Sequence, residues 1–512
     1  MQESRKIKTI RNLIYAWLSQ GFTITMNIIV RIIFVHILSK EYLGITGLFS
    51  NIITILSVAE LGVGSAIVYG LYEPLAKNDQ KHIKALMQFY QKIYTGIGIF
   101  ILIAGFALTP YISWFIKELP DIPHLQFIYF LFICNTAASY FFSYKGTLIS
   151  ADQKEYMLKK IRIKVLFSMY IAQIIILLIT KNYIAFLLVQ VISTIIINFG
   201  YSLAADHMYP FLKDKYKIRL DPPQLQQIVK NTKALFCHKI GSVAVFSTDN
   251  LILSKYTGLD NVADYSNYIL IQETLNGILT QLFSAMSASI GNLIAIEDKQ
   301  TSLNTFWKIM FLDSWLYGNC TICFLCLAQD FIRLCFGENY LVSTNILIII
   351  IINFYLTGIR KCVITFKDAY GLFSQNWYMP LLEAIINLLV SIGLVLKFGV
   401  IGVLIGTTIS SLLVPVWSEP YILFHYGFQQ TVIDYWKQNS KYLSLLIFSA
   451  IIAWYISSLI PYIPVVSFLL KGICCLSITN ITFYLVLRKE QNMKYFLNLY
   501  KIFKKFTLIN FK

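Results

Sequence analysis

The chain is dominated by stretches of about 20 residues or more that carry almost no charge. Residues 42–59, for example, contain no charged side chain, and a further apolar run follows Glu60 to about residue 72. An apolar helix of about 20 residues is long enough to cross a bilayer, and a helix satisfies its own backbone polar groups. Because such stretches recur along the whole chain, the sequence predicts an all-α polytopic membrane protein.

Composition supports the same class. Only 13% of the 512 residues are charged and 57% are hydrophobic, whereas an ordinary soluble domain has about 25% charged residues. A chain of this kind does not need to build one large globular core, because the bilayer itself acts as the apolar solvent.

We predict about fourteen transmembrane helices from the apolar runs. Their ranges are 12–37, 42–71, 89–112, 125–150, 163–180, 182–205, 234–256, 264–296, 304–328, 339–364, 378–396, 399–424, 442–460 and 465–487. Two six-helix lobes are expected at 1–205 and 234–424, and an extra helix pair at 442–487. Between the lobes, 206–233 is expected to form a cytoplasmic linker, in which Pro222 and Pro223 open an interfacial helix. Residues 488–512 are expected to form a basic amphipathic cytoplasmic tail.

The distribution of basic residues predicts the orientation. With the N-terminus in the cytoplasm, 33 of the 43 lysines and arginines fall in cytoplasmic segments and 6 in outer loops. Cytoplasmic loops of membrane proteins carry this excess, so both termini are predicted to be cytoplasmic, with the basic N-terminus leading into a retained first span. The net charge of +17 then faces anionic lipid headgroups, and nucleic acid need not be invoked. The remaining four bases lie inside spans: Arg31, Lys145, Lys239 and Lys471.

The nine cysteines lie mostly inside apolar runs. Cys320, Cys323 and Cys326 have a spacing that metal ligands also use, but they lie in a predicted membrane helix without nearby histidine or acidic ligands. We therefore interpret them as packing residues, and we expect neither a metal site, a cofactor nor disulfide bonds.

A short motif recurs between the two halves of the chain. LSKEYLGITGLFSNI at Leu38–Ile52 is similar to LSKYTGLDNVADYSNY at Leu253–Tyr268, about 215 residues later. The offset corresponds to six predicted spans. An even number of spans per repeat gives both halves the same orientation, which predicts two six-helix bundles related by an axis along the membrane normal.

Several stretches resemble the polysaccharide flippases of the multidrug/oligosaccharidyl-lipid/polysaccharide exporter superfamily. The resemblance is strongest over residues 31–92 and 139–165, which includes FFSYKGTLISADQKEY, and it weakens after about residue 426. STDNLILSKYTGLDNVADYSNY (247–268) and the glycine-rich GVIGVLIGTTIS (399–410) also carry it.

The resemblance implies two six-helix lobes around a central cavity that opens alternately to either side of a bacterial cytoplasmic membrane. It implies a cargo of undecaprenyl-diphosphate-linked sugar repeat units, moved from the cytoplasmic to the outer leaflet. Membrane lipids, a proton or sodium ion as coupling ion, and glycan polymerase or assembly proteins are the other expected partners.

An anionic diphosphate cannot cross hydrocarbon unaided, so cationic side chains at membrane depth are the candidate ligands of the cargo. Arg31 is the first candidate, because it lies towards the outer side against the charge rule. The others could equally extend to lipid headgroups, and Arg31 could form a static pair. The full set is Arg31, Lys145, Lys239, Arg360 and Lys361.

Carboxylates in spans are the candidates for ion coupling or gating, since a buried acid can carry a proton or bind sodium. Glu60, Asp249 and Glu383 are our candidates, and each could instead lock a lobe through a salt bridge. Weaker candidates of the same kind are Glu273, Asp313 and Glu419.

Other functions fit less well. The chain has no GxxxxGK, HExxH or DxD motif, and it lacks the large outer loop expected of a glycan polymerase or ligase, so no enzyme activity is predicted. A cation-coupled multidrug exporter of the same fold is the main alternative, although its often cationic cargo would favour acids over the bases found in spans. A scaffold subunit without transport activity is a third possibility.

Overall fold

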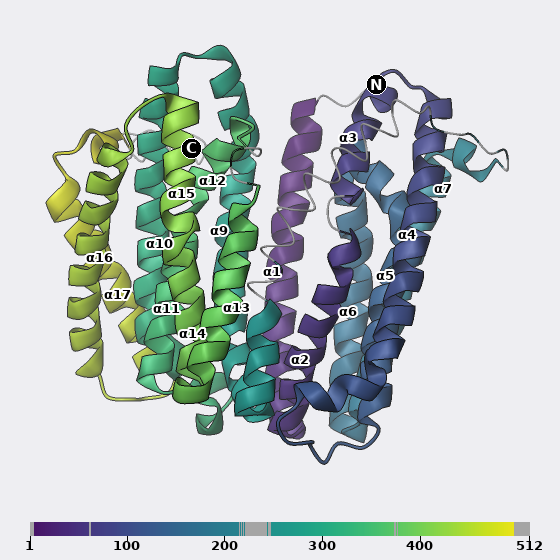
Figure 1. Cartoon of the computed structure of the whole chain (residues 1–512), viewed down its shortest axis with the longest axis horizontal. Helices are drawn as coiled ribbons and strands as arrows, with labels where there is room; N and C mark the ends of the chain where they lie inside the picture. Colours follow the sequence, from purple (N-terminus) through teal and green to yellow (C-terminus); the bar gives the residue numbers. More distant parts are fainter. Residues whose placement is uncertain are drawn as a thin grey trace, which may run out of the picture. The chain divides into compact units, whose positions relative to one another are not determined.

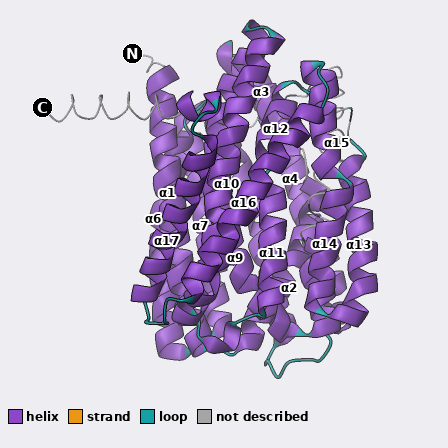
Figure 2. Cartoon of the chain, turned by 90° about the vertical axis from the view of Figure 1, so that its left-hand side faces the viewer, coloured by secondary structure: helices purple, strands orange, loops and turns teal. Residues whose placement is uncertain are grey.

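The computed structural model describes residues 5–60, 63–214, 216, 218, 220, 243, 247–372, 375 and 377–495. Over these residues the chain is helical and contains no strand (Figures 1 and 2). The prediction of an all-α membrane protein is therefore confirmed. Chain packing separates two compact units, one of residues 1–266 and 395–399 and the other of residues 267–394 and 400–512.

Among the described residues, the first unit begins with seven helices that follow one another in sequence. They are α1 (Arg5–Ile37), α2 (Lys40–Leu56), α3 (Val63–Ala76), α4 (Gln80–Leu108), α5 (Leu125–Ala151), α6 (Glu155–Thr180) and α7 (Tyr183–Met208). Helix α9 (Leu259–Ile296) begins in this unit and continues into the second.

The second unit contains the rest of α9 and the later helices. These are α10 (Lys299–Cys335), α11 (Thr344–Gly358), α12 (Lys361–Ala369), α13 (Met379–Phe398), α14 (Val400–Leu413), α15 (Pro415–Ile422), α16 (Ile433–Ser458) and α17 (Val466–Leu487). The last residues of α13 are grouped with the first unit.

Eleven helices of the described chain are long and apolar enough to span a membrane, or up to twelve if the bent α5 is one span. The predicted number of fourteen therefore stays a prediction. Of the other two predicted spans, 42–71 is divided into α2, a 3₁₀ turn at Ser57–Glu60 and α3. Most of the other, 234–256, lies outside the described residues, as do the predicted interfacial helix after Pro222 and Pro223 and the tail beyond residue 495.

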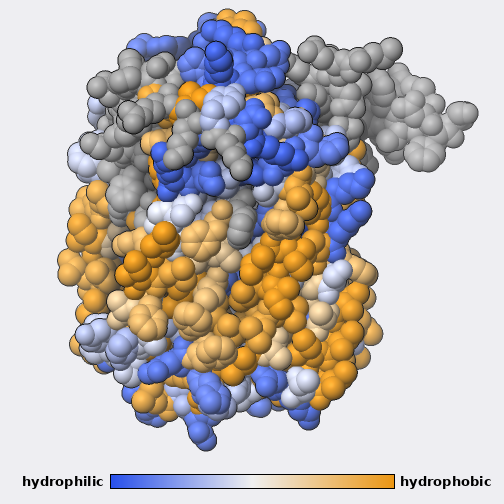
Figure 3. Space-filling view, turned by 90° about the vertical axis from the view of Figure 1, so that its right-hand side faces the viewer, coloured by the Kyte–Doolittle hydropathy of each residue, from blue (hydrophilic) through white to orange (hydrophobic). Residues whose placement is uncertain are grey.

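The surface agrees with a membrane environment. On the face drawn in Figure 3, apolar side chains form a band with polar side chains at both ends. The loops lie at the ends of the helices (Figure 2), where caps satisfy free backbone N–H groups. The Asp79 carboxylate accepts the N–H of His82 at the start of α4, and Asp298 accepts that of Thr301 at the start of α10.

Two helical stretches of the second unit are interrupted. The chain leaves α11 at Gly358 and begins α12 at Lys361, and it leaves α14 at Leu413 and begins α15 at Pro415. Proline lacks a backbone N–H and cannot continue the hydrogen bonding of a preceding helix. Both breaks are short, and Thr344–Ala369 and Val400–Phe428 each still form one candidate span. Charged side chains lie beside both breaks and are described below.

Helices α16 and α17 pack along α10 inside the second unit. Ile322 and Leu446 belong to a buried cluster there with Cys475, and Cys323 and Cys326 pack against it. Polar bonds extend the contact: Trp315 Nε1 donates to Asn480 Oδ1 at 2.9 Å. Cys323 and Cys326 of α10 therefore contribute to helix packing.

Candidate substrate and coupling sites

The two copies of the repeated sequence motif contact each other in the first unit. Lys40, at the start of α2, places its ammonium 2.7 and 2.8 Å from the two carboxylate oxygens of Asp264 on α9. Both side chains are largely buried, with 24% and 16% of their surfaces exposed. An ion pair in such a setting interacts more strongly than one on an open surface. The pair thus joins the beginning of the second predicted span to the beginning of the eighth.

Glycines allow the backbones of the two motif copies to approach closely. A Cβ at Gly44 would overlap the carbonyl oxygen of Leu259, and one at Gly47 would lie 2.9 Å from the hydroxyl of Ser266. Small residues at helix crossings permit this close packing in membranes. We name the contact of Lys40, Gly44 and Gly47 with the first turns of α9 the motif contact.

Arg31 and Asp249, the first cationic candidate and one acidic candidate, both lie in the first unit. Arg31 lies on α1 and is partly exposed. The positive charge of its guanidinium interacts with the phenol of Tyr183 on α7. Asp249 is almost fully buried. Lys239 lies outside the described residues.

Lys145 of α5 is engaged by a carboxylate. Its ammonium lies 2.6 and 2.7 Å from the two oxygens of Asp206 on α7, and each side chain is 18% exposed. A lysine held by two carboxylate oxygens must exchange that partner before it can bind a phosphate. The pair therefore fits a structural role for Lys145 as well as a place in a cargo site.

Glu60 lies at the 3₁₀ turn between α2 and α3 and is surrounded by phenols. The hydroxyl of Tyr94 on α4 donates a hydrogen bond to Oε1 of Glu60, and the hydroxyl of Tyr140 on α5 donates one to Oε2 at 2.8 Å. The rings of Tyr90 and Tyr94 pack with their centroids 4.1 Å apart. We name Glu60, Tyr90, Tyr94 and Tyr140 the tyrosine cluster.

The tyrosine cluster surrounds one carboxylate with hydrogen-bond donors. Within the described part of the chain, no lysine, arginine or histidine forms an ion pair with Glu60. Phenol hydrogen bonds stabilise a carboxylate but leave its net charge uncompensated. A proton or a monovalent cation would remove that charge, which is costly among apolar helices.

Arg360 joins the two helix interruptions of the second unit. It precedes α12, and its Nε and Nη2 each donate to one carboxylate oxygen of Glu419 on α15 at 2.9 Å. The pair is bidentate and strongly buried, with 16% and 8% of the side chains exposed. Lys367 of α12 adds a second cation 3.7 Å from Glu419.

Glu383 completes this group from α13. Its Oε1 accepts a hydrogen bond from Ser411 of α14 at 3.1 Å and lies 3.8 Å from Nη1 of Arg360. Glu383 is thus the less tightly held of the two acids beside Arg360. We name Arg360, Lys367, Glu383 and Glu419 the α12–α15 charge cluster.

Lys361, the neighbour of Arg360, lies close to a buried acid of α10. The Asp313 carboxylate, which is 1% exposed, accepts the backbone N–H of Cys362 at 3.2 Å through Oδ2. A carboxylate at the first turn of a helix satisfies a free N–H and interacts favourably with the helix dipole. Asp313 therefore anchors the start of α12 to α10, with the charge of Lys361 nearby.

The structure thus brings together Arg360, Glu383 and Glu419 among the residues singled out by sequence. It places Arg31, Lys145 and Glu60 at separate positions of the first unit. Sequence reasoning missed Asp206 and the tyrosines of the tyrosine cluster. The four-residue spacing of Tyr90 and Tyr94 was a usable signal, because it places both on one helix face. No group of histidine, cysteine and acidic residues in the described ranges has the arrangement of a metal site.

These features define a multi-pass helical membrane protein with interrupted helices and buried charges. A family model described as "Polysaccharide biosynthesis protein" matches residues 33–345. The chain therefore belongs to this polysaccharide biosynthesis family.

Individual relatives agree with the family. A Salmonella typhimurium LT2 protein named "Putative O-antigen transporter" is 25% identical over 214 residues, which is 40% of this chain and 48% of that protein. The chain thus matches about half the length of that curated relative. Among solved structures, the lipid II flippase MurJ in an inward closed conformation gives a TM-score of 0.66 at 14% identity, covering 94% of this chain and 99% of that one. An inward-facing multidrug resistance MATE transporter gives 0.59 at 13% identity, covering 77% and 91%. The structural matches establish a shared fold.

Replacing Arg360 tests whether the α12–α15 charge cluster is structural. Removing one partner of a buried ion pair costs about 3–5 kcal/mol, so we expect Arg360→Ala to lower the thermal unfolding temperature of the purified protein and its level in membranes. Arg360→Lys should recover only part of the loss, because lysine cannot form the two parallel hydrogen bonds.

Lys437→Ala is the matched control, since Lys437 forms an exposed ion pair with Asp434. It should unfold at the wild-type temperature. If Arg360→Ala also does so while transport is lost, the cluster is a cargo site rather than a structural one.

Proposed function

We propose that the protein moves undecaprenyl-diphosphate-linked oligosaccharide repeat units from the cytoplasmic to the outer leaflet of a bacterial cytoplasmic membrane. The observation that carries this proposal is membership of the polysaccharide biosynthesis family over residues 33–345. The curated relative named as an O-antigen transporter and the MurJ-like fold support the same class of cargo. Both termini are cytoplasmic in this proposal, which follows the distribution of lysine and arginine.

The diphosphate is the part of such a cargo that needs protein help. Its charge is costly in hydrocarbon, and guanidinium groups bind phosphate oxygens with charge-assisted hydrogen bonds. Lys145 and Arg360 already bind carboxylates in their own units. Arg31 remains our first candidate for the cargo because it lies towards the outer side against the charge rule, with Lys239 and Lys361 behind it.

The variant Arg31→Ala tests the cationic site. We expect surface glycan to fall and lipid-linked repeat units to accumulate on the cytoplasmic side, at equal protein levels in the membrane. Arg31→Lys should restore part of the export because it keeps the charge. Unchanged glycan export together with lower resistance to cationic drugs would replace the flippase assignment with the multidrug exporter.

Transport requires opening towards each side in turn, and the motif contact supplies a closure that can open. In the proposed topology it lies at the outer ends of α2 and α9. It is held by one ion pair and two glycine crossings, which can separate without unfolding a helix. We infer that the motif contact is closed while the cargo enters from the cytoplasm and parts when the cargo leaves.

Cross-linking tests this cycle. In cells that carry Lys40→Cys together with Asp264→Cys, a short bis-maleimide reagent should stop glycan export once the two positions are joined. Each single cysteine variant, treated in the same way, is the matched control and should keep exporting, which also accounts for the native cysteines. Full export after complete cross-linking would show that the cycle does not open this contact.

We further propose that the tyrosine cluster couples transport to a proton or a sodium ion. Glu60 carries the charge that such an ion neutralises, and the phenols of Tyr94 and Tyr140 position it. Asp249 and Glu383 are the further candidates. Glu383 lies within reach of Arg360, so its protonation would alter the α12–α15 charge cluster.

Glu60→Gln tests this coupling, because glutamine keeps the shape but cannot carry the charge. We expect normal protein levels, loss of export, and no remaining dependence on the proton or sodium gradient. Glu73→Gln is the control, since Glu73 is an exposed residue of α3 paired with Lys77. Export by Glu60→Gln that still follows the ion gradient would contradict the proposal.

The absence of enzyme activity also stays part of the proposal. The named relatives are transporters or flippases, which favours transport over a polymerase or ligase. The multidrug exporter remains the alternative because MATE transporters share the fold.

A further inference from the structure

An ion pair lies between the extra helix pair and the body of the second unit. The ammonium of Lys471 on α17 is 2.6 Å from Oδ2 of Asp330 on α10, and the two side chains are 13% and 9% exposed. Charges inside membrane helices are costly and usually mark a function. The transport proposal makes no use of this pair.

A cavity of about 150 Å³ adjoins the pair. Its lining combines charged, hydroxyl, amide and aromatic groups from α10, α11, α16 and α17: Asp330, Lys471, Gln329, Thr344, Ser457 and Trp454. An apolar cavity of about this size holds a benzene molecule. The volume therefore suits one small polar group and is too small for an oligosaccharide.

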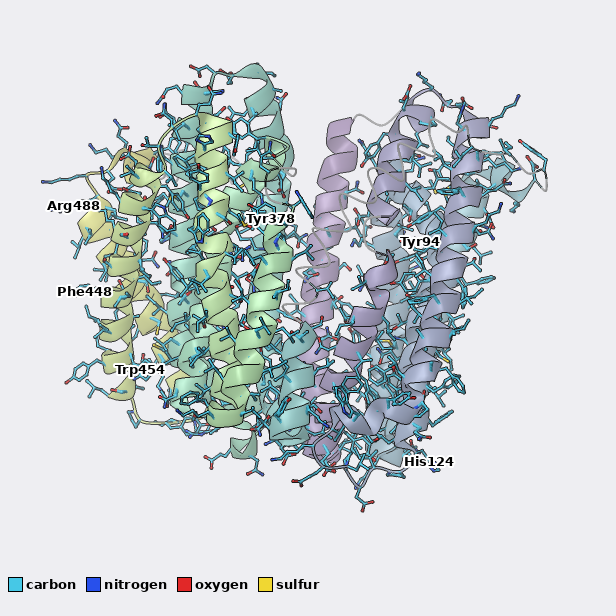
Figure 4. All side chains as sticks on the ribbon, in the orientation of Figure 1. Tyr94, His124, Tyr378, Phe448, Trp454 and Arg488 are labelled. Atoms are coloured by element: carbon cyan, nitrogen blue, oxygen red, sulfur yellow. The ribbon has the colours of Figure 1, made fainter. Side chains whose placement is uncertain are left out.

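The cavity lies near the ends of the helices. Lys471 is five residues from the start of α17 and Asp330 five residues from the end of α10, which is about 7.5 Å at a rise of 1.5 Å per residue. Trp454 lies towards the opposite end of the helix pair from Arg488 (Figure 4). The cavity therefore lies about one and a half helical turns inside these ends, on the side predicted to be external.

The surface beside the cavity is apolar. Phe448 and Ile451 are exposed along α16 on the way from Trp454 towards the middle of the helix, and Tyr455 is exposed next to Trp454. Acyl chains can cover such a surface, whereas a water-soluble ligand cannot use it. A lipid whose headgroup enters the cavity therefore makes both polar and apolar contacts.

We propose that this cavity binds the phosphoethanolamine headgroup of a membrane lipid. The phosphate would accept hydrogen bonds from the Lys471 ammonium, which has three donors and gives one to Asp330. The primary ammonium of the lipid would donate to the Asp330 carboxylate. The phosphate and the ammonium of the zwitterionic headgroup would thus each bind a side chain of opposite charge in the lining of the cavity.

The same wall discriminates between lipids. An anionic headgroup such as phosphoglycerol would place a second negative charge beside Asp330 and bring no cation to it. A quaternary ammonium is larger and has no N–H to donate, so phosphocholine would lose the bond to Asp330. The bound lipid would connect α16 and α17 to α10 and α11, and it would stabilise the docked helix pair.

Thermal unfolding of the purified full-length protein tests the proposal. Dioleoyl phosphatidylethanolamine, dioleoyl phosphatidylcholine and dioleoyl phosphatidylglycerol are added separately to the same detergent. A ligand that binds only the folded state raises the unfolding temperature, so phosphatidylethanolamine should raise it by several degrees more than the other two. Native mass spectrometry should retain one such lipid per chain.

Two variants localise the effect. The double variant Lys471→Met with Asp330→Leu removes both charges. It should lose the rise in unfolding temperature that phosphatidylethanolamine causes, which we call the increment. Thr344→Trp fills the cavity from the exposed end of α11 without touching the ion pair, and it should lose the increment even if the double variant does not fold. Lys441→Met is the control, because Lys441 pairs with Glu490 towards the other end of α16, and it should keep the increment.

Equal stabilisation by all three lipids, or an increment that survives Thr344→Trp, would overturn the proposal. Preference for phosphatidylglycerol would also overturn it, since that lipid cannot bind Asp330. These outcomes leave the flippase assignment untouched. Loss of glycan export in Arg31→Ala conversely says nothing about this cavity.

Discussion

The free-energy cost of a charge among apolar helices governs how the interior of this protein is arranged. Removing an ion from water costs several kcal/mol unless a partner and hydrogen bonds compensate it. The protein meets this requirement with pairs that join different helices: Lys145 to Asp206, Arg360 to Glu419 and Lys471 to Asp330. Each pair therefore also determines which helices lie together and how they are rotated. Glu60 is handled differently, since among the described residues it accepts hydrogen bonds from phenols and forms no ion pair.

The same requirement explains where the helices are interrupted. A break in a membrane helix leaves backbone N–H and C=O groups that must find partners. At the start of α12 the N–H of Cys362 is satisfied by Asp313, and Arg360 ties that break to α15. The charged side chains thus stabilise the ends of the helices at this break, and the break in turn places these side chains next to one another. Removing one of the charged side chains alone would therefore lower the free energy of unfolding. This mutual dependence separates the α12–α15 charge cluster from the simpler pair of Lys145 and Asp206.

Much of the fold could be predicted because each helix must satisfy its own backbone inside the membrane, and long uncharged stretches show where that happens. The charges within spans, such as Arg31 and Glu60, were visible for the same reason. Their partners were not. In a soluble protein, the polar face of a helix shows which side of that helix faces the solvent. Here the lipid-facing and the buried positions are both apolar, so the sequence does not show which side of a helix is buried. For this reason Asp206 could not be predicted as the partner of Lys145, nor Tyr140 as the partner of Glu60. Tertiary packing alone decides those pairs.

In the proposed cycle, the motif contact influences how often the protein opens without cargo. Because the first turns of α9 pack on α2 through Gly44 and Gly47, the boundary between the two compact units falls inside α9, at residues 266 and 267. In the proposed cycle, a contact that favours the closed arrangement by about 3 kcal/mol keeps the open one below about 1% of the population. The cargo must then prefer the open arrangement by a similar free energy. A stronger contact would lower the apparent affinity for cargo, and a weaker one would let the protein open without cargo. The strength of this ion pair therefore sets a compromise between preventing leakage and transporting cargo quickly.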